Sequence, residues 1–180
     1  MRIVAGTWRG RTLVAPPGWN TRPTSDRARQ ALFDMILHAP WGGHDVLAGT
    51  RVLDVFAGTG ALGLEALSRG AAHAVFVEQD RAALAALRVN IAACRAEARC
   101  TVLAADALTL GPGQACGFVF LDPPYGRGLV PPAVARLRAG GWIDPDALVV
   151  AETGQGEPAL DAVPLAERTH GAARLTIWRV

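Results

Sequence analysis

From residue 51 onward, apolar residues fall into short runs whose spacing alternates between that of strands and that of helices. The pattern predicts strands at 51–56, 73–78, 100–104, 116–121 and 147–152, and helices at 61–69, 80–94 and 129–139. Such alternation is typical of an α/β fold with a parallel sheet. The strictly alternating run at 173–180 predicts an edge strand paired antiparallel with residues around 163–168.

The first 50 residues have a different pattern. Residues 2–20 alternate loosely between apolar and polar positions and contain glycine turns, which predicts a small hairpin. A helical pattern runs from Ala28 to Ile36, with Thr24 or Ser25 as its expected N-cap. A glycine-rich linker at 38–50 leads into the first core strand. We therefore divide one structural domain into an N-terminal extension, 1–40, and a main unit, 41–180.

Composition fits one compact enzyme of 180 residues, 51% hydrophobic and 19% charged. No apolar run nears the roughly 20 residues of a membrane span, and no signal-peptide pattern opens the chain. The three cysteines and four histidines have no metal-ligand spacing. We expect a cytoplasmic monomer without a metal site.

Charge is distributed unevenly along the chain. Residues 1–30 hold six of the eighteen arginines but only one of the sixteen acidic residues. The segment Arg9-Gly10-Arg11 lies beside Trp8, and Arg22, Arg27 and Arg29 surround the expected helix start. Arginines with an aromatic ring are typical of RNA contacts, although a solvated strand edge explains the first group equally well. At the helix start, a solvated face is the better explanation when those residues are taken without the rest of the chain.

A glycine-rich loop follows the first predicted core strand. Gly58, Gly60 and Gly63 form the pattern G-x-G-x-x-G, and Glu78 ends the next strand 20 residues after Gly58. This spacing is typical of a nucleoside site with a carboxylate for the ribose. Asp54 lies inside the strand, where an acid needs a ligand or a donor. The glycines fit a dinucleotide and S-adenosylmethionine equally well.

The strand at 116–121 ends in Asp122-Pro123-Pro124-Tyr125. The two prolines fix φ and remove backbone donors, so the corner offers mainly acceptors. Acceptors suit an exocyclic NH₂ group, and Tyr125 offers a ring to stack on its base. Asp-Pro is also common in ordinary turns.

These motifs, in this order, resemble the D-P-P-Y methyltransferases that use S-adenosylmethionine and act on amino groups of bases. The N-terminal Arg2-Ile3-Val4-Ala5-Gly6, Arg9-Gly10-Arg11 and Arg22-Pro23-Thr24-Ser25-Asp26 resemble, more narrowly, the RsmD-type bacterial enzymes that methylate guanine N2 in 16S ribosomal RNA. The resemblance spans nearly the whole chain. Thr59 and Thr153 depart from it, since the family more often has Ser and His there.

The resemblance implies a Rossmann-like class I methyltransferase fold, with a mostly parallel seven-stranded sheet, an antiparallel C-terminal edge and a small N-terminal hairpin and helix. It implies methyl transfer to small-subunit RNA, assembled wholly or partly into a 30S particle. The implied catalytic residues are Asp122, Pro123, Pro124 and Tyr125. The implied cofactor residues are Asp54, Phe56, Ala57, Gly58, Thr59, Gly60, Glu78, Asp106 and Ala107. The implied RNA contacts are Arg2, Arg9, Arg11, Arg22 and Arg27. Asp80 is instead expected to cap a helix.

Other functions remain open at this point. A DNA adenine enzyme or another RNA methyltransferase would share the D-P-P-Y motif. An NAD-dependent oxidoreductase would explain the glycines and Glu78 but not the segment Asp122 to Tyr125. A non-catalytic RNA-binding protein would explain the arginine-rich residues 1–30, here called the basic arm, but not both intact motifs.

Overall fold

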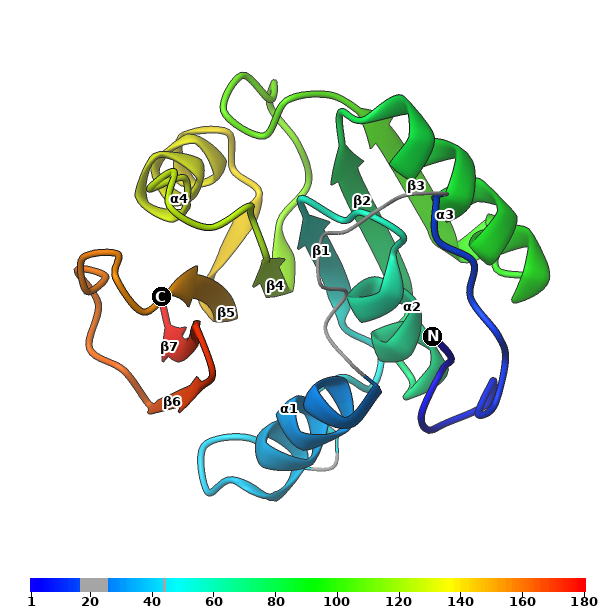
Figure 1. The fold of residues 1–180 in the computed structure, drawn as a ribbon, viewed down its shortest axis with the longest axis horizontal. Coiled ribbons are helices and arrows are strands. Elements are labelled where there is room, and N and C mark those ends of the chain that lie inside the picture. Colours follow the sequence, from blue (N-terminus) through cyan, green and yellow to red (C-terminus); the bar gives the residue numbers. More distant parts are fainter. Residues whose placement is uncertain (17–25, 44) are drawn as a thin grey trace.

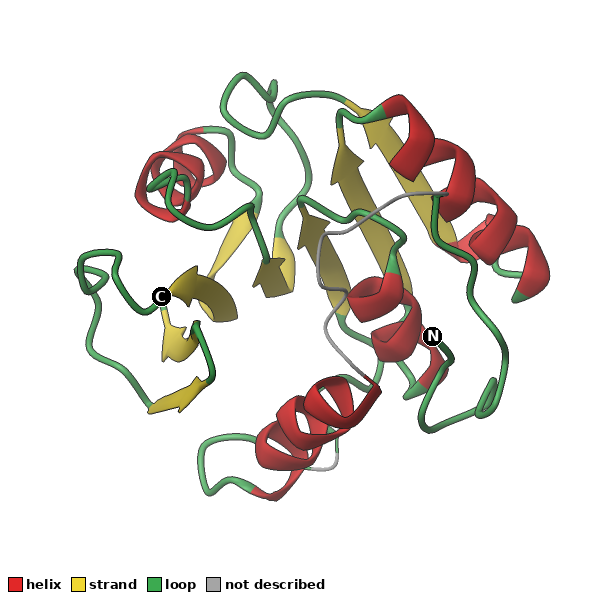
Figure 2. Cartoon of the chain, in the orientation of Figure 1, coloured by secondary structure: helices red, strands yellow, loops and turns green. Residues whose placement is uncertain are grey.

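The structure, a computed structural model, describes residues 1–16, 26–43 and 45–180 (Figure 1). In chain order its elements are α1 (Asp26–His38), β1 (Arg51–Val55), α2 (Ala61–Ser68), β2 (His73–Glu78), α3 (Arg81–Ala93), a 3₁₀ turn (Glu97–Arg99), β3 (Cys100–Ala104), β4 (Cys116–Leu121), α4 (Val130–Ala139), β5 (Ile143–Gly154), β6 (Ala166–His170) and β7 (Ala173–Arg179). The expected strand and helix alternation is confirmed (Figure 2).

The strands of the described chain form one seven-stranded sheet in the order β3-β2-β1-β4-β5-β7-β6. The five strands from β3 to β5 are parallel, whereas β7 runs antiparallel to both of its neighbours. The chain moves outward from β1 to β3 and then returns to place β4 on the other side of β1. This reversal between β1 and β4 is the position at which doubly wound sheets bind ligands.

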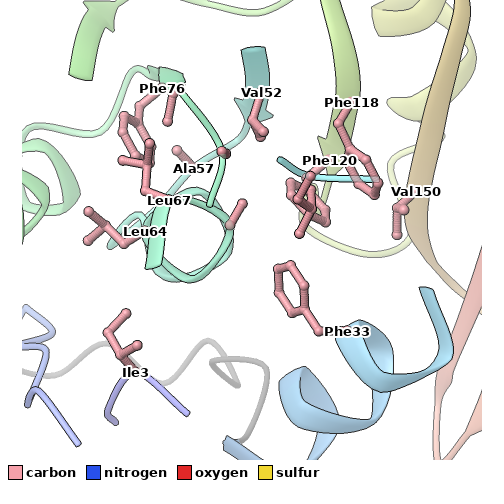
Figure 3. Close-up of a cluster of buried hydrophobic side chains, with 14 of the residues drawn as sticks. Ile3, Phe33, Val52, Ala57, Leu64, Leu67, Phe76, Phe118, Phe120 and Val150 are labelled. Atoms are coloured by element: carbon pink, nitrogen blue, oxygen red, sulfur yellow. The ribbon is translucent and has the colours of Figure 1, made fainter. Parts of the chain in front are cut away.

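Two apolar layers enclose the sheet. On one face, α1, α2, α3 and the N-terminal segment bury alternate strand residues, and Phe33 of α1 points toward Phe118 and Phe120 of β4 (Figure 3). The ring centroids of Phe33 and Phe120 lie 5.7 Å apart, and those of Phe118 and Phe120 4.8 Å. On the other face, α4 and Trp142 cover the remaining strand residues. Burial on both faces explains why the inner parallel strands β1, β2 and β4 are nearly continuous apolar runs.

Two expectations about strands were wrong. The strand at 173–180 is not an edge strand, because β7 lies between β5 and β6 and buries Thr176, Ile177 and Trp178. The edge strand is the polar and mostly exposed β6. Strand β5 also begins at Ile143, earlier than the predicted residue 147, with a register irregularity opposite Gly117. Its early part contains Pro145 between two aspartates and therefore resembles a turn.

The expected N-terminal hairpin is also only partly formed. Within residues 1–16 a single bridge joins Arg2 to Thr12, and the backbone N–H of Ile3 donates to the carbonyl of Arg11 over 2.9 Å. The pairing does not extend into regular strands, because several backbone N–H groups next to the bridge donate to helix side chains instead. The amides of Val4 and Ala5 donate to the carboxylate of Glu65, over 2.8 Å and 3.0 Å.

Candidate functional site

The candidate site lies at the carboxyl ends of the parallel strands. Strand pairing sets Val55 beside both Val77 and Leu121, and Leu121 beside Ala151. Strands β1, β2, β4 and β5 therefore reach this edge of the sheet together. The glycines follow β1, Glu78 is the last residue of β2, and the D-P-P-Y corner follows β4. The two predicted motifs therefore flank the switch point between β1 and β4.

The glycine loop is a compact turn with left-handed backbone. Phe56, Gly58 and Gly60 have φ values of 61°, 55° and 78°. A Cβ on Gly60 would lie 2.3 Å from Cδ1 of Leu87, so a side chain at this position would collide with α3. Phe56 takes up a conformation that is strained for a bulky residue, which is common where a chain is shaped for function. The loop therefore presents backbone rather than side chains to a ligand.

Glu78 connects the end of β2 to the glycine loop. Its Oε2 accepts from the N–H of Gly58 over 2.7 Å, and its Oε1 accepts from the N–H groups of Gln79 and Asp80, each over 2.8 Å. An ionised carboxylate has about four acceptor positions. Glu78 thus holds the loop and retains capacity to accept from a hydroxyl.

Asp54 is almost fully buried, with 1% of its surface exposed. Its Oδ2 accepts from the backbone N–H of Gly63 over 2.8 Å. Burial raises the pKa of this carboxyl well above its usual range, and the nearby Asp122 and Glu78 raise it further, against the Gly63 hydrogen bond. A buried carboxyl of this kind is suited to a neighbouring cationic group, which would favour its charged form.

The remaining predicted cofactor residues have mixed surroundings. Asp106 follows β3, and its Oδ1 accepts from the N–H of Leu108 over 2.9 Å, which closes a turn. Ala107 and Ala57 are buried in opposite apolar layers. Thr59 is 4% exposed, and its carbonyl accepts from the side chain of Asn90 over 3.0 Å.

The D-P-P-Y corner is more open than the glycine loop. Asp122 follows β4 and lines a small cavity of about 10 Å³ together with Leu62 and Glu152. Pro123 is buried, whereas Pro124 is exposed. Tyr125 is 42% exposed, and its hydroxyl donates to a carboxylate oxygen of Glu152. The hydrogen bond of the hydroxyl group therefore fixes the orientation of the ring, and part of the ring remains exposed to solvent.

The arm arginines differ from one another. Arg2, Arg9, Arg11 and Arg27 are exposed, and all but Arg11 line an open groove of about 520 Å³ with Asp26. Arg22, Thr24 and Ser25 lie outside the described residues. Arg29 was grouped with the surface arginines, and this was wrong, because it is fully buried and its guanidinium lies 2.9 Å from Asp26 and 3.6 Å from Glu65.

Three polar side chains that hold segments next to the site were not predicted from the sequence. Glu65 of α2 is fully buried and pairs with Arg69 over 2.8 Å as well as with Arg29. Asn90 of α3 accepts from the Val14 N–H over 2.8 Å and donates to the Val14 carbonyl over 3.0 Å. Glu157, after β5, accepts from backbone groups of the segment that follows Tyr125. Glu65 and Asn90 could have been found as polar residues on the apolar faces of their helices.

The helix cap at Asp80 is confirmed, since its Oδ1 accepts from the Ala83 N–H over 2.8 Å. Trp8, expected beside the basic arm, has the guanidinium carbon of Arg99 4.9 Å from its ring centroid. Among the described residues, no cluster of three or more His, Cys, Asp or Glu is arranged to hold a metal ion. No helix in that part of the chain has the length and apolar character to cross a membrane.

A family model described as "Conserved hypothetical protein 95" matches residues 1–179. The chain belongs to this family. Ribosomal RNA small subunit methyltransferase D of Escherichia coli K12 is 41% identical to this chain over 165 residues. The match covers 91% of this chain and 79% of the relative. The protein of the same name from Haemophilus influenzae is 33% identical over 188 residues, covering 99% and 93%.

Solved structures of similar proteins have the same fold as this chain. That of yhhF from Escherichia coli has a TM-score of 0.84 and 35% identity, covering 99% of this chain and 97% of that chain. An RNA methyltransferase from Salinibacter ruber, solved with S-adenosyl-L-homocysteine, has a TM-score of 0.64 and covers 87% and 92%. Its 14% identity shows a shared fold alone. The expected methyltransferase fold is confirmed.

Proposed function

We propose that this protein transfers a methyl group from S-adenosylmethionine to the exocyclic N2 amine of a guanine in small-subunit ribosomal RNA. One observation carries the proposal: the glycine loop and the D-P-P-Y corner meet at the switch point between β1 and β4. Family membership and the 41% identity to the Escherichia coli small-subunit methyltransferase support the same reaction class.

The residues around the glycine loop fit the cofactor. The left-handed turn from Phe56 to Gly60 leaves backbone accessible for the methionyl part, and the buried Asp54 suits its ammonium group. Glu78 has acceptor capacity for the ribose hydroxyls, and Asp106 follows the neighbouring strand, where an adenine amine would need an acceptor. Ala57, Gly58, Thr59 and Ala107 complete the proposed contacts. Bound S-adenosylmethionine supplies a sulfonium methyl that needs no further activation.

The acceptor corner must align a weak nucleophile. The N2 lone pair of guanine is delocalised into the ring, so the amine attacks poorly unless it is polarised and aimed. The Asp122 carboxylate and the Pro123 carbonyl would accept from the two N–H bonds, localising the lone pair and directing it toward the methyl group. Preorganised acceptors of this kind lower the barrier by several kcal/mol. Pro124 fixes the turn and Tyr125 would stack on the base after it leaves its helix.

The N-terminal extension would hold the RNA. Arg2, Arg9, Arg11 and Arg27 are exposed and Arg22 lies in the same basic segment. Phosphate contacts fix orientation without reading sequence, so this extension, 1–40, would orient the RNA relative to the main unit, 41–180. We further propose that a monomer acts in the cytoplasm on an assembled or partly assembled 30S particle.

The decisive experiment is transfer of labelled methyl to unmodified small-subunit particles and to naked small-subunit RNA, followed by nucleoside analysis. N2-methylguanosine in either substrate supports the proposal, and the faster substrate identifies the assembly state. Methyladenine would favour an adenine-directed enzyme. RNA binding without transfer would favour a non-catalytic protein, and tight binding of NAD in place of S-adenosylmethionine would favour an oxidoreductase.

A further inference from the structure

The segment that follows Tyr125 is held by a single acidic residue, Glu157, which comes after β5. The Oε1 atom of Glu157 accepts from the N–H of Gly126 over 2.9 Å, and its Oε2 accepts from the N–H of Gly128 over 3.1 Å. The same Oε1 accepts from the N–H of Gly154 over 3.0 Å. One carboxylate therefore joins the loop after β4 to the end of β5 with three hydrogen bonds.

Glu157 is itself fixed in place. The N–H of Glu157 donates to the carbonyl of Gly154 over 3.0 Å, and the Nη2 atom of Arg174 on β7 donates to the carbonyls of Glu157 and Pro158, each over 2.7 Å. The three amide donors lower the pKa of the Glu157 carboxyl, with Gly154 as the largest cause, and Arg174 contributes in the same direction. The acid is thus charged at neutral pH, and its backbone is tied to the sheet.

Tyr125 lies inside this arrangement. Its hydroxyl donates to a carboxylate oxygen of Glu152, which belongs to the same strand, β5, as Gly154. A Cβ added to Gly154 would lie 3.4 Å from the Cβ of Tyr125 and 3.3 Å from the Oε1 of Glu157. A side chain at Gly154 would therefore press on the tyrosine and on the acid together. The end of β5 thus lies close to both Tyr125 and the acid that holds the following loop.

We propose that Glu157 is a positioning residue for the D-P-P-Y corner, an inference that rests on the proposed function. It fixes the segment from Gly126 to Gly128 against the end of β5, so that Tyr125 presents its ring in one orientation before the guanine arrives. Glu157 does not touch the reacting atoms. It acts through Tyr125, by reducing the conformational freedom that base binding would otherwise have to remove.

The test compares Glu157→Gln with Glu167→Gln, a matched control on the exposed edge strand β6. Gln keeps the size of the side chain but turns one acceptor into a donor, which then faces a backbone N–H. We expect Glu157→Gln to lower kcat/KM for the RNA substrate by about 10-fold to 100-fold. Its Kd for S-adenosylmethionine should stay within about twofold of wild type, because the glycine loop is unchanged. Glu167→Gln should match wild type in both.

A second variant, Gly154→Ala, perturbs the same contacts without removing the acid. It should also lower kcat/KM for the RNA substrate while leaving the Kd for S-adenosylmethionine near its wild-type value. Wild-type kcat/KM in a folded Glu157→Gln protein would overturn the inference. So would a loss of cofactor affinity as large as the loss of transfer, since that pattern indicates a general structural role. If the wild-type protein itself transfers no methyl group, the proposed function fails, and the two failures are distinguishable.

Discussion

The two halves of the candidate site are built in opposite ways. At the glycine loop, buried polar side chains hold the backbone from inside: Asp54 is 1% exposed and Asn90 is 1% exposed. At the D-P-P-Y corner, the contacts come from Glu152 and Glu157 near the surface, and Tyr125 is 42% exposed. The proposed function gives this difference a reason, because a small cofactor can be enclosed by the core, whereas a base of a large RNA would have to enter from outside.

The largest expected effect is at a buried ion-pair network on α2, the helix that follows the glycine loop. Glu65→Ala would remove the carboxylate that pairs with both Arg29 and Arg69. Breaking a buried ion pair costs about 3–5 kcal/mol, so we expect a loss of this size in the free energy of unfolding, measured by urea denaturation. A loss below about 1 kcal/mol, the range of exposed ion pairs, would contradict a buried network.

The next effect tests the open side. Asp122→Ala should lower the single-turnover rate of methyl transfer by about 10²–10³-fold, as when a preorganised polar group is removed from a transition state. Cofactor affinity measured by calorimetry should survive. Asp122→Asn keeps one acceptor oxygen, so a smaller defect indicates that alignment dominates, and an equal defect indicates that the charge does. Full activity in Asp122→Ala would eliminate the proposed mechanism.

Glu78→Ala should weaken S-adenosylmethionine binding by about 1–3 kcal/mol, the usual cost of removing a charged hydrogen-bond partner. The loss has two sources, because Glu78 would contact the ribose and also holds the Gly58 N–H over 2.7 Å. Calorimetry on the folded variant measures the sum. Unchanged affinity would remove Glu78 from the cofactor site.

A smaller effect is expected from the basic arm. Replacing Arg9, Arg11 and Arg22 by Ala should reduce the slope of log affinity for RNA against log salt by about 0.7–0.9 for each phosphate that the arm no longer neutralises. Cofactor affinity should stay the same. The control is Arg138→Ala on the exposed side of α4. A wild-type salt slope in the triple variant would show that the arm has a structural role only.

The last effect is a dependence of stability on pH. Because the folded-state pKa of Asp54 is raised, the folded protein binds this proton more tightly than the unfolded chain does. The stability that this tighter proton binding contributes is fully present below the pKa of Asp54 in the unfolded chain. It is lost as pH rises through the pKa of Asp54 in the folded protein. Asp54→Asn should flatten this decline in urea denaturation measured across that range. An equal decline in the variant would assign it to another group.

The strands at 73–78, 100–104 and 116–121 were predicted with their observed bounds. For β2 and β4 the reason is burial, which gives short, nearly continuous apolar runs that stand out from the polar residues after them. The glycine loop and the D-P-P-Y corner were found for a similar reason, since each is a local motif next to a strand. The cap at Asp80 needed only its own helix.

What the sequence did not reveal depends on contacts between distant segments. Glu65 meets the amides of Val4 and Ala5, 61 and 60 residues away, and Asn90 meets Val14 76 residues away. No periodic pattern records such pairs. The order of β6 and β7 was missed because alternation shows that a strand has two faces but not how many neighbours it pairs with.

Asn90 also determines how far the N-terminal arm can be treated as a separate module. Its amide group bonds both backbone groups of Val14 and the carbonyl of Thr59 in the glycine loop, while Ser68 accepts from the N–H of Trp8. A chimaera that grafts this arm onto another methyltransferase would have to transplant the receiving residues on α2 and α3 as well. Asn90 is the side chain that bonds both the arm and the glycine loop, so a substitution at this position would disturb both segments at once.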